Sequence, residues 1–425
     1  MSSNLLRRAV AISFPLVIVV LRVVGAGPPS ATKDEEEVGY ALIRAARQGD
    51  TQAVQRIVAS HPGVINAQPP TSAKGMESHL DQWSALHWAV GRNDHAMAEF
   101  LVKHGADTNG KVACEHRPLG IAKDHRMAKV LIDAGADVNA ADEFGHEPLD
   151  EVRDGDVARL LIEKGAMIDD QANLTEGTPL IRAAEDDRLD VARVLVEHKA
   201  NVNARNCVEE TPLHFACRNG DLAMVKLLVE HGADPLAADS ERATPLWHAA
   251  GGAFYENPPE KQHAAIAEFL ATHGASLSAK NGEGETLLHL AAKTTRVEVA
   301  KYLLRAGLDV NARMRNGITP LHYAAEVPGG GWGFRSDGTG EIAMVKLLIE
   351  HGADVNAEAL AQIDDSTESQ TRYKTSKVTP LAYAMVVARV VPVQCGDPER
   401  IKENVDRTNR TRKVIADLLR QHGAK

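Results

Sequence analysis

Two short apolar patterns alternate along most of the chain and predict pairs of helices. The clearest copy spans residues 211–220 (Thr-Pro-Leu-His-Phe-Ala-Cys-Arg-Asn-Gly) and residues 221–234. Thr211 can cap the first helix through its hydroxyl group, and Pro212 suits the first helical turn. Asn219 and Gly220 break the first helix, where a left-handed conformation is needed, and Gly232 ends the second helix. Apolar residues share one face of each predicted helix: Leu213, Ala216 and Cys217 in the first, and Leu222, Val225, Leu227 and Leu228 in the second.

The same pair of segments recurs at a step of 33 residues, which separates Pro179, Pro212 and Pro245. A closing motif recurs after the second segment, as His104-Gly-Ala-Asp107, Ala134-Gly-Ala-Asp137, His231-Gly-Ala-Asp234, His273-Gly-Ala-Ser276, Ala306-Gly-Leu-Asp309 and His351-Gly-Ala-Asp354. This period, with Thr-Pro-Leu-His-x-Ala at its start, resembles the ankyrin repeat. The resemblance covers roughly residues 39 to 425. It implies an all-α solenoid of about ten stacked helix-turn-helix units with β-hairpin-like fingers.

Several units depart from the regular pattern. The third and fourth, which open at Pro118 and Pro148, are short in their helices, so we expect a weak joint there. Units seven, nine and ten carry insertions between their two helices, around residues 257–260, 329–340 and 391–398. Two further insertions lengthen fingers, at about residues 68–80 and 358–378. Within the second of these, residues 362–371 are polar and are expected to be mobile.

The N-terminal residues have the pattern of an export signal. Arg7 and Arg8 precede an apolar run from Ala9 to Leu21, and small residues follow. Residues 1–26 are therefore predicted to be a signal peptide, with an acidic linker at 27–38. The run is short for a spanning helix, which needs ~20 apolar residues, but Arg22 is unfavourable for cleavage and leaves an uncleaved membrane anchor open. We expect an exported protein, in the periplasm, outside the cell or in a secretory lumen.

Charge and cysteine content exclude some classes of function. The formal net charge is −10, which argues against nucleic-acid binding because that needs a basic surface. The four cysteines are Cys114, Cys207, Cys217 and Cys395, and they show no CxxC motif or zinc-ligand spacing. Cys207 and Cys217 are close enough in sequence to pair. The alternative is two separate thiols, with Cys217 packed in the core.

Histidine is abundant, with 18 residues, but its positions indicate structural roles. Four lie in the Leu-His motif (His87, His214, His289 and His322), and six close a second helix (His104, His198, His231, His273, His351 and His422). The first set is expected to bond threonine hydroxyls and backbone between units. The sequence lacks the G-x-S-x-G, P-loop and H-E-x-x-H motifs. We therefore predict no catalytic residue, no metal site and no cofactor.

The resemblance implies that another protein binds the concave face, at the finger tips and the exposed turns of the first helices. The residues at those positions are Phe144, His146, Arg205, Val208, Arg218, Arg313, Arg315, Asn316 and Ile318. Arg205, Arg313 and Arg315 place positive charge on the fingers of an acidic protein, and arginine is favoured at binding hot spots. The insertions add the aromatic residues Phe254, Tyr255, Trp332 and Phe334. These aromatic residues either form a second contact patch or fold back over the edge of the solenoid.

These patterns favour a monomeric, non-catalytic protein-protein interaction module that acts as a scaffold, inhibitor or adaptor. Two alternatives remain open at this stage. One is an enzyme or ligand-binding protein whose site is built from the inserted loops. The other is a structural spacer tethered to a membrane, which requires that the N-terminal segment is not cleaved.

Overall fold

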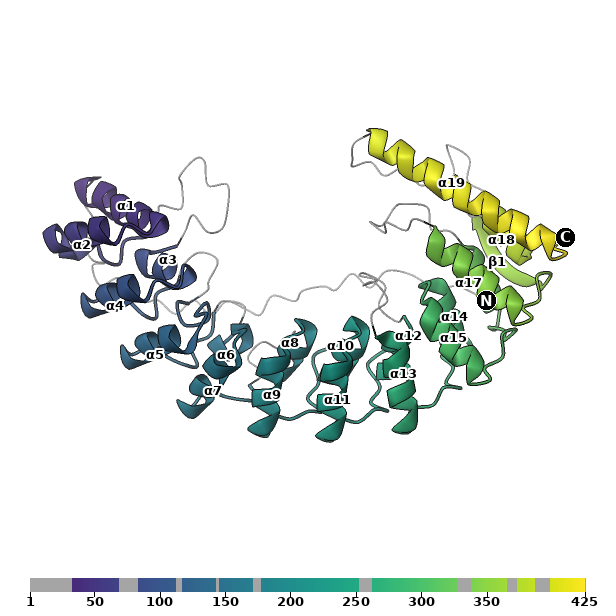
Figure 1. Ribbon diagram of the computed structural model, residues 1–425, viewed down its shortest axis with the longest axis horizontal. Helices are drawn as coiled ribbons and strands as arrows, with labels where there is room; N and C mark the ends of the chain where they lie inside the picture. Colours follow the sequence, from purple (N-terminus) through teal and green to yellow (C-terminus); the bar gives the residue numbers. More distant parts are fainter. Residues whose placement is uncertain are drawn as a thin grey trace, which may run out of the picture.

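The computed structural model describes residues 33–68, 83–111, 117–142, 145–170, 177–251, 262–326, 338–364, 373–386 and 398–424. In these residues the chain forms nineteen α-helices that stack side by side into a crescent (Figure 1). The first helices of the units are α1 (Lys33–Gln48), α3 (Ala85–Gly91), α6 (Pro148–Glu151), α8 (Pro179–Glu185), α10 (Pro212–Asn219), α12 (Pro245–Ala250), α14 (Leu287–Lys293), α16 (Pro320–Ala325) and α18 (Pro380–Val386). The second helices are α2 (Thr51–Ser60), α4 (His95–Lys103), α5 (His125–Asp133), α7 (Gly155–Glu163), α9 (Leu189–Glu197), α11 (Leu222–Glu230), α13 (His263–Thr272), α15 (Val297–Arg305), α17 (Thr339–Glu350) and α19 (Pro398–Gln421).

The all-α solenoid expected from the sequence is confirmed. The first helices α8, α10 and α12 lie toward the inside of the curve, and the second helices α9, α11 and α13 lie toward the outside (Figure 1). Each helix pair contacts the pairs before and after it, as in the series α8, α10, α12 and α14. None of the helices in the described part of the chain combines the length and hydrophobicity needed to span a bilayer.

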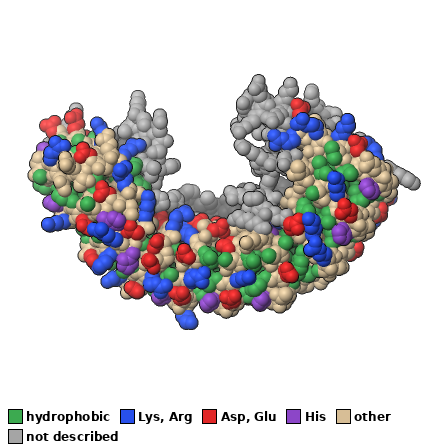
Figure 2. All heavy atoms as spheres, in the orientation of Figure 1, with side chains coloured by type: hydrophobic (Ala, Val, Ile, Leu, Met, Phe, Trp, Pro, Cys, Tyr) green, Lys and Arg blue, Asp and Glu red, His purple; other side chains and the backbone are tan. Residues whose placement is uncertain are grey.

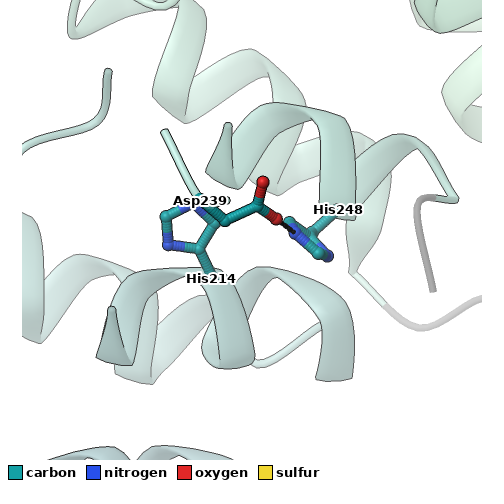
Figure 3. A group of neighbouring side chains, drawn as sticks. All are labelled: His214, Asp239 and His248. Carbon is teal, nitrogen blue, oxygen red and sulfur yellow. Dashed lines mark hydrogen bonds and ion pairs between the residues drawn. The ribbon is translucent and has the colours of Figure 1, made fainter. Parts of the chain in front are cut away.

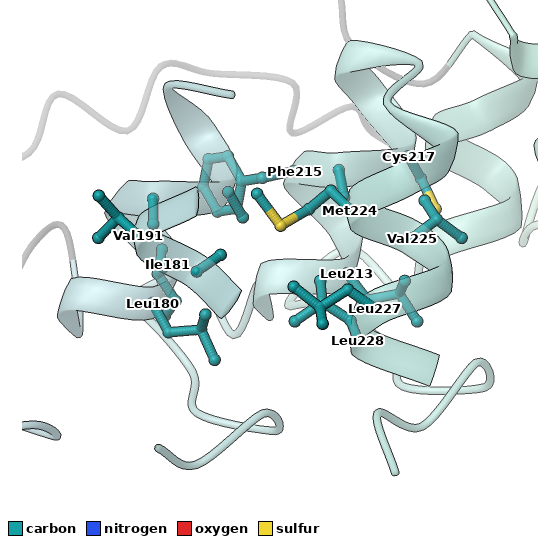
Figure 4. Close-up of a cluster of buried hydrophobic side chains, with 14 of the residues drawn as sticks. Leu180, Ile181, Val191, Leu213, Phe215, Cys217, Met224, Val225, Leu227 and Leu228 are labelled. Atoms are coloured by element: carbon teal, nitrogen blue, oxygen red, sulfur yellow. The ribbon is translucent and has the colours of Figure 1, made fainter. Parts of the chain in front are cut away.

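The core is one continuous apolar layer between the units, from Leu42 in α1 to Leu419 in α19. Side chains of α8 and α9 meet those of α10 and α11 in this layer (Figure 4). Leu213, Cys217 and Leu228 are fully buried there, as the apolar pattern predicts. Burying a leucine-sized side chain contributes about 1.5–3 kcal/mol, so each unit depends on its neighbours to cover its apolar face.

The histidines of the Leu-His motif connect successive units. Nδ1 of His214 lies 2.9 Å from the Thr211 hydroxyl and accepts the Thr211 backbone N–H, while Nε2 donates to the carbonyl of Ala243 in the next unit at 3.2 Å. His289 repeats the arrangement, with its Nε2 donating to the carbonyl of Ile318 at 3.1 Å. Burial lowers the pKa of His214 and of His289 to about 4, so both rings are neutral at pH 7. Their predicted structural role is confirmed.

The six histidines that close second helices are also structural. In each, Nδ1 donates to the backbone carbonyl four residues earlier, at 2.8 Å: His104, His198, His231, His273, His351 and His422. This bond satisfies one of the last helical carbonyls, which have no partner within the helix.

Replacing His289 by Ala should lower the free energy of unfolding by about 2–3 kcal/mol, because the Ile318 carbonyl and the Thr286 backbone N–H would lose their buried partner. Urea unfolding with an unchanged m-value measures this loss. His104→Ala, at an exposed helix end, is the control and should cost less than about 1 kcal/mol. Equal losses in both variants would contradict the structural role of the Leu-His motif.

Asparagine side chains join the fingers into a row. The amide of Asn203 donates to the carbonyl of Gly232 at 3.0 Å, and its oxygen accepts the backbone N–H of Asp234 at 2.8 Å. Asn66, Asn109 and Asn311 make the same two bonds, to a glycine carbonyl and an aspartate N–H of the unit that follows. Asn139 also makes two such bonds, but its oxygen accepts the N–H of Met167. Asn139, Asn203 and Asn311 each lie in a Val-Asn-Ala segment, which recurs along the sequence, so this motif fixes the spacing between fingers.

A second set of side chains caps the first helices from the neighbouring unit. In each case a side chain of one unit donates a hydrogen bond to a backbone carbonyl at or next to the C-terminal end of the first helix in the unit before it. The pairs, donor first, are Arg92 and Arg47, Asn219 and Glu185, His263 and Arg218, and Thr294 and Ala250. At the junction of the fourth and fifth units the donor is Arg188, which bonds the carbonyls of Asp150 and Val152. These bonds tie each unit to the one before it.

The third and fourth units are shortened, as predicted. Residues 118–121 form a turn where the first helix of the third unit is expected, and α6 contains 4 residues. Residues 33–38, which the sequence places in the acidic linker, form the start of α1. Asp34, Glu35 and Glu36 occupy its first turn, where negative charge stabilises a helix. The predicted signal segment, residues 1–26, lies outside the described residues.

The structure describes the long finger after α17 in part, and residues 365–371 of the segment predicted to be mobile lie outside the described residues. The finger contains two antiparallel strands, β1 (Ala359–Asp364) and β2 (Tyr373–Val378), paired from Ala359↔Val378 to Asp364↔Tyr373. At the base of this hairpin, the side chains of the paired residues Ala359 and Val378 point to the same face and pack against Ile318 in a small apolar cluster. This packing anchors the two strands to the stack.

Candidate functional site

The structure describes eight of the eleven residues that the sequence selects as candidates for partner binding. Phe144, Trp332 and Phe334 lie outside the described residues, as do Phe254 and Tyr255. The outer curve of the described surface carries acidic and basic side chains interspersed, without a single-sign patch (Figure 2).

Arg205 and Val208 lie on the finger between the fifth and sixth units. Nη1 of Arg205 donates to the carbonyl of Ala238 on the next finger at 2.8 Å and pairs with Glu209 at 3.2 Å. Val208 is 43% exposed, and its carbonyl accepts the backbone N–H of Ser240 at 3.0 Å. Arg205 therefore fixes the positions of two neighbouring fingers relative to each other. Val208 exposes an apolar side chain to solvent on the same finger.

The finger between the eighth and ninth units holds Arg313, Arg315 and Asn316. Nη1 of Arg313 donates to the carbonyl of Glu358 at 3.0 Å, and the carbonyl of Asn316 accepts the N–H of Leu360 at 2.7 Å. Arg315 differs from both: its side chain is 73% exposed and its nearest carboxylate, Glu283, is 3.8 Å away. Arg315 is therefore the arginine of this finger that is best placed to meet a partner.

Ile318 does not belong to the exposed face. Its side chain is 5% exposed because the base of the β1–β2 hairpin covers it with Ala359 and Val378. The selection of Ile318 as a contact residue is corrected by this burial.

Arg218 belongs to a buried polar network on the first-helix side of the fingers. It forms an ion pair with Glu210, and its guanidinium lies 4.8 Å from the centre of the Phe215 ring. Nε2 of His248 lies 3.0 Å from Asp239 and 3.8 Å from Glu210. The Arg218 side chain is 24% exposed, so this residue supports the concave surface more than it projects from it.

Two groups of three side chains within the described residues have the composition of a metal site. His214, Asp239 and His248 have donor atoms within 4.8 Å of one another and lie side by side (Figure 3). Both nitrogens of His214 are used, by Thr211 and by the Ala243 carbonyl, and Nε2 of His248 bonds Asp239. Hydrogen bonding thus accounts for this arrangement without an ion, and we assign it no metal.

His146 belongs to the second of these groups, with Asp142 and Glu151. Its Nδ1 lies 3.2 Å from Asp142, which also accepts the His146 backbone N–H at 2.8 Å. These bonds close the finger turn, in the same way that Asp239 accepts the N–H of Ala243. His146 is mostly buried and holds the turn in shape, and we assign this group no metal either.

Cys207 and Cys217 are not joined by a disulfide. Cys217 is fully buried in α10, and burial raises the pKa of its thiol strongly, whereas Cys207 lies exposed on a finger. Of the two alternatives from the sequence, separate thiols with Cys217 in the core is confirmed.

Sequence reasoning missed a cavity of about 580 Å³, which we name the notch. It lies at the C-terminal ends of the first helices of units two to five, and its walls include Trp83, Ile121, Lys123, Glu151, Arg153 and Arg182. The signal was present in the sequence, because the short third and fourth units remove helical turns there. From the sequence alone, however, a shortened repeat predicts a weak joint and not a cavity.

Comparison with known protein families gives two matches. A model described as ankyrin repeats (3 copies) matches residues 42–142 and 259–359, and one described as ankyrin repeats (many copies) matches residues 180–229. No curated protein matches the sequence. The matched segments lie between residues 42 and 359 and together cover more than half of the chain.

Proposed function

Since the chain belongs to the ankyrin-repeat family, whose repeats are generally protein-protein interaction modules, we propose that it binds a protein partner on its concave finger and first-helix face without catalysing a reaction. Scaffold, inhibitor and adaptor are the roles that fit such a module. The shape supports this proposal, because stacked units present an extended concave surface.

One observation carries the proposal most strongly. The fingers are fixed to one another by asparagine bonds and by Arg205 and Arg313, so they form a preorganised row. Side chains that are not needed for this row remain exposed at the tips, above all Val208 and Arg315. A rigid surface with exposed apolar and arginine side chains binds with little loss of conformational entropy.

The double variant Val208→Glu/Arg315→Glu should lose its partner in affinity capture from the native extract, because it places negative charge on the finger tips. The matched control is Val414→Glu/Arg305→Glu. Val414 is 43% exposed, like Val208, and both control positions lie on second helices away from the fingers. We expect the wild type and the control to capture the same protein, with about tenfold or greater loss in the finger variant.

Capture that is equal in all three proteins would contradict binding at the finger tips. If no protein is captured even by the wild type, the enzyme and spacer alternatives would gain support. Circular dichroism and urea unfolding of each variant would show that loss of binding does not reflect loss of the fold.

Export of the protein through residues 1–26 is part of the same proposal. The order of basic, apolar and small residues supports a cleaved signal peptide. N-terminal sequencing of the native protein distinguishes cleavage after Ala26 from an uncleaved membrane anchor.

A further inference from the structure

Unit seven lies near the middle of the crescent, where α12 and α13 stand between the pairs α10–α11 and α14–α15 (Figure 1). On each side of this unit, neighbouring fingers are bonded to each other through their backbones. Before it, the N–H of Ser240 donates to the carbonyl of Val208 at 3.0 Å. After it, the N–H of Arg315 donates to the carbonyl of Glu283 at 2.9 Å. The fingers on either side of unit seven therefore belong to two bonded blocks.

The finger of residues 236–243 ends the first block, and the finger of residues 278–285 begins the second. Within the part of the stack that the structure describes, no hydrogen bond or ion pair joins these two fingers. The row of fingers thus has a boundary in unit seven, and the residue types found there explain it.

Two residues that tie regular units together are replaced at this boundary. Leu236 occupies the position that Asn203 occupies 33 residues earlier, and its alkyl side chain can neither donate nor accept a hydrogen bond. This side chain is 55% exposed, so apolar packing does not take the place of the lost bonds. Trp247 occupies the position of His214, and among the described residues its indole makes no hydrogen bond to the next finger.

The asparagine position after unit seven is changed as well. Ser278 stands 33 residues before Asn311, which bonds the unit that follows it. The shorter hydroxyl of Ser278 lies 3.2 Å from the hydroxyl of Ser276 in the same loop. Unit seven is therefore bounded on both sides by positions that lack the asparagine bonds to the next unit.

The opposite edge of the same units is closely connected. Nε2 of His263 donates to the carbonyl of Arg218 at 3.1 Å, and the Thr294 hydroxyl donates to the carbonyl of Ala250 at 3.4 Å. A Cβ atom added at Gly251 would overlap Thr294, so the units are also tightly packed there. These contacts lie at the C-terminal ends of first helices, whereas the fingers precede their N-terminal ends. One edge of unit seven is thus held, and the finger edge is not.

We propose that the stack hinges at unit seven about the edge opposite the fingers, so that the two finger blocks move relative to each other. The apolar core continues through α12, α13 and α14, so the units stay stacked during this motion. Within each block the fingers keep the fixed spacing that their bonds impose. Motion concentrates where few hydrogen bonds oppose it, and a closely packed edge serves as the pivot.

The hinge has a consequence for binding, because Val208 lies in the first block and Arg315 in the second. The hinge position sets the separation of these two side chains, and a partner that contacts both would favour one position. The hinge itself does not depend on the proposed function, since it is measured on the protein alone.

Distance distributions between pairs of spin labels test the hinge on the full chain. One pair, at Glu230 and Arg305, spans unit seven, and the reference pair, at Arg305 and Gln421, spans unit nine. All three residues are exposed and lie at the ends of second helices, two positions before a glycine. Labels carried by keto amino acids leave the native cysteines unlabelled. We expect a broader distribution for the pair across unit seven than for the reference pair.

The variant Leu236→Asn/Ser278→Asn supplies the missing amides and should narrow the distribution across unit seven to the width of the reference pair. The control Leu236→Ala/Ser278→Ala removes the same exposed side chains without adding an amide and should leave the distribution as broad as in the wild type. A wild-type distribution as narrow as that of the reference pair would overturn the inference. A broad distribution that the two asparagines leave unchanged would also overturn it. Either result would leave the proposed function in place, because partner capture tests that function separately.

Discussion

Replacing Glu147 by Gln and Asp150 by Asn together should raise the free energy of unfolding at about pH 8 by about 3 kcal/mol, with little gain at about pH 4. Glu147 and Asp150 occupy the positions of Thr and His in the Thr-Pro-Leu-His motif. Glu147 accepts the Asp150 backbone N–H, and Asp150 accepts the Glu147 N–H at 2.8 Å. Each carboxylate nevertheless keeps one buried oxygen without a partner, Oε2 of Glu147 and Oδ1 of Asp150.

The surroundings favour the protonated form of both groups. Burial raises the pKa of Glu147 to about 7, and three negative charges add to the effect: Asp170, Asp150 and Asp137. Burial likewise raises the pKa of Asp150 to about 6, and Glu151 adds to it. The backbone N–H of Glu147 and the charges of His146 and Arg182 oppose this second shift.

The direction of the pH dependence follows from these shifts. Both folded pKa values lie above the unfolded values of about 4.3 for Glu and about 3.9 for Asp. The folded state therefore binds protons more tightly, so this contribution to stability is fully present below about pH 4 and is lost as the pH rises to about 7. The two groups influence each other and titrate as a pair, so the loss is smaller than the sum of two separate shifts. The Gln and Asn amides keep the capping bonds and carry no charge at any of these pH values.

Urea unfolding across this pH range measures the effect. The control Asp156→Asn/Glu163→Gln removes two acids from the exposed side of α7 in the same unit and should change stability by less than about 0.5 kcal/mol. If the wild type and Glu147→Gln/Asp150→Asn show the same pH dependence, the buried acid pair does not control the stability of this joint.

Much of the fold could be read from the sequence because the repeat encodes local and neighbouring contacts in the same few positions. Thr211 and His214 specify a helix start and also a bond to the next unit, so one motif predicts both. Asn203 similarly encodes the distance to the next finger. Where these positions change, as at Glu147 and Asp150, the sequence shows the departure but not its energetic consequence.

The candidate site was harder to predict because exposure depends on residues far along the chain. Ile318 occupies an exposed position in a regular unit, but the strands that bury it begin about forty residues later, at Ala359. Arg205 and Arg313 lie on fingers, yet their bonds to neighbouring carbonyls depend on the geometry of the stack. The notch is created by missing turns, and a deletion does not reveal which side chains will line the space it leaves.

Replacing Arg188 by Ala should lower the free energy of unfolding by about 3–5 kcal/mol, the range found when one partner of a buried ion pair is removed. Arg188 stands at the N-cap of α9, a position that Asp holds in α2, α4, α5, α7 and α11. Its buried guanidinium satisfies the carbonyls of Asp150 and Val152, which the short helix α6 leaves without helical partners. The variant would leave these oxygens, and Asp186, without their donor.

The control for this prediction is Arg193→Ala, an exposed position on the same helix α9, which should cost less than about 0.5 kcal/mol. A loss of similar size in both variants would show that helix α9, and not the cap on α6, determines the result.

The consequence for the whole chain should be larger than a uniform loss of stability. In a repeat array each unit is stabilised by its neighbours, so a weakened interface divides the array into blocks that unfold separately. In Arg188→Ala we expect two urea transitions, one for the units before α8 and one for those from α8 onward, with fast hydrogen exchange confined first to α6 and α7. A single transition shifted to lower urea would mean that the units on both sides remain coupled without Arg188. The joint between the fourth and fifth units would then be held by apolar contacts such as those of Leu149 and Leu180, and not by the arginine.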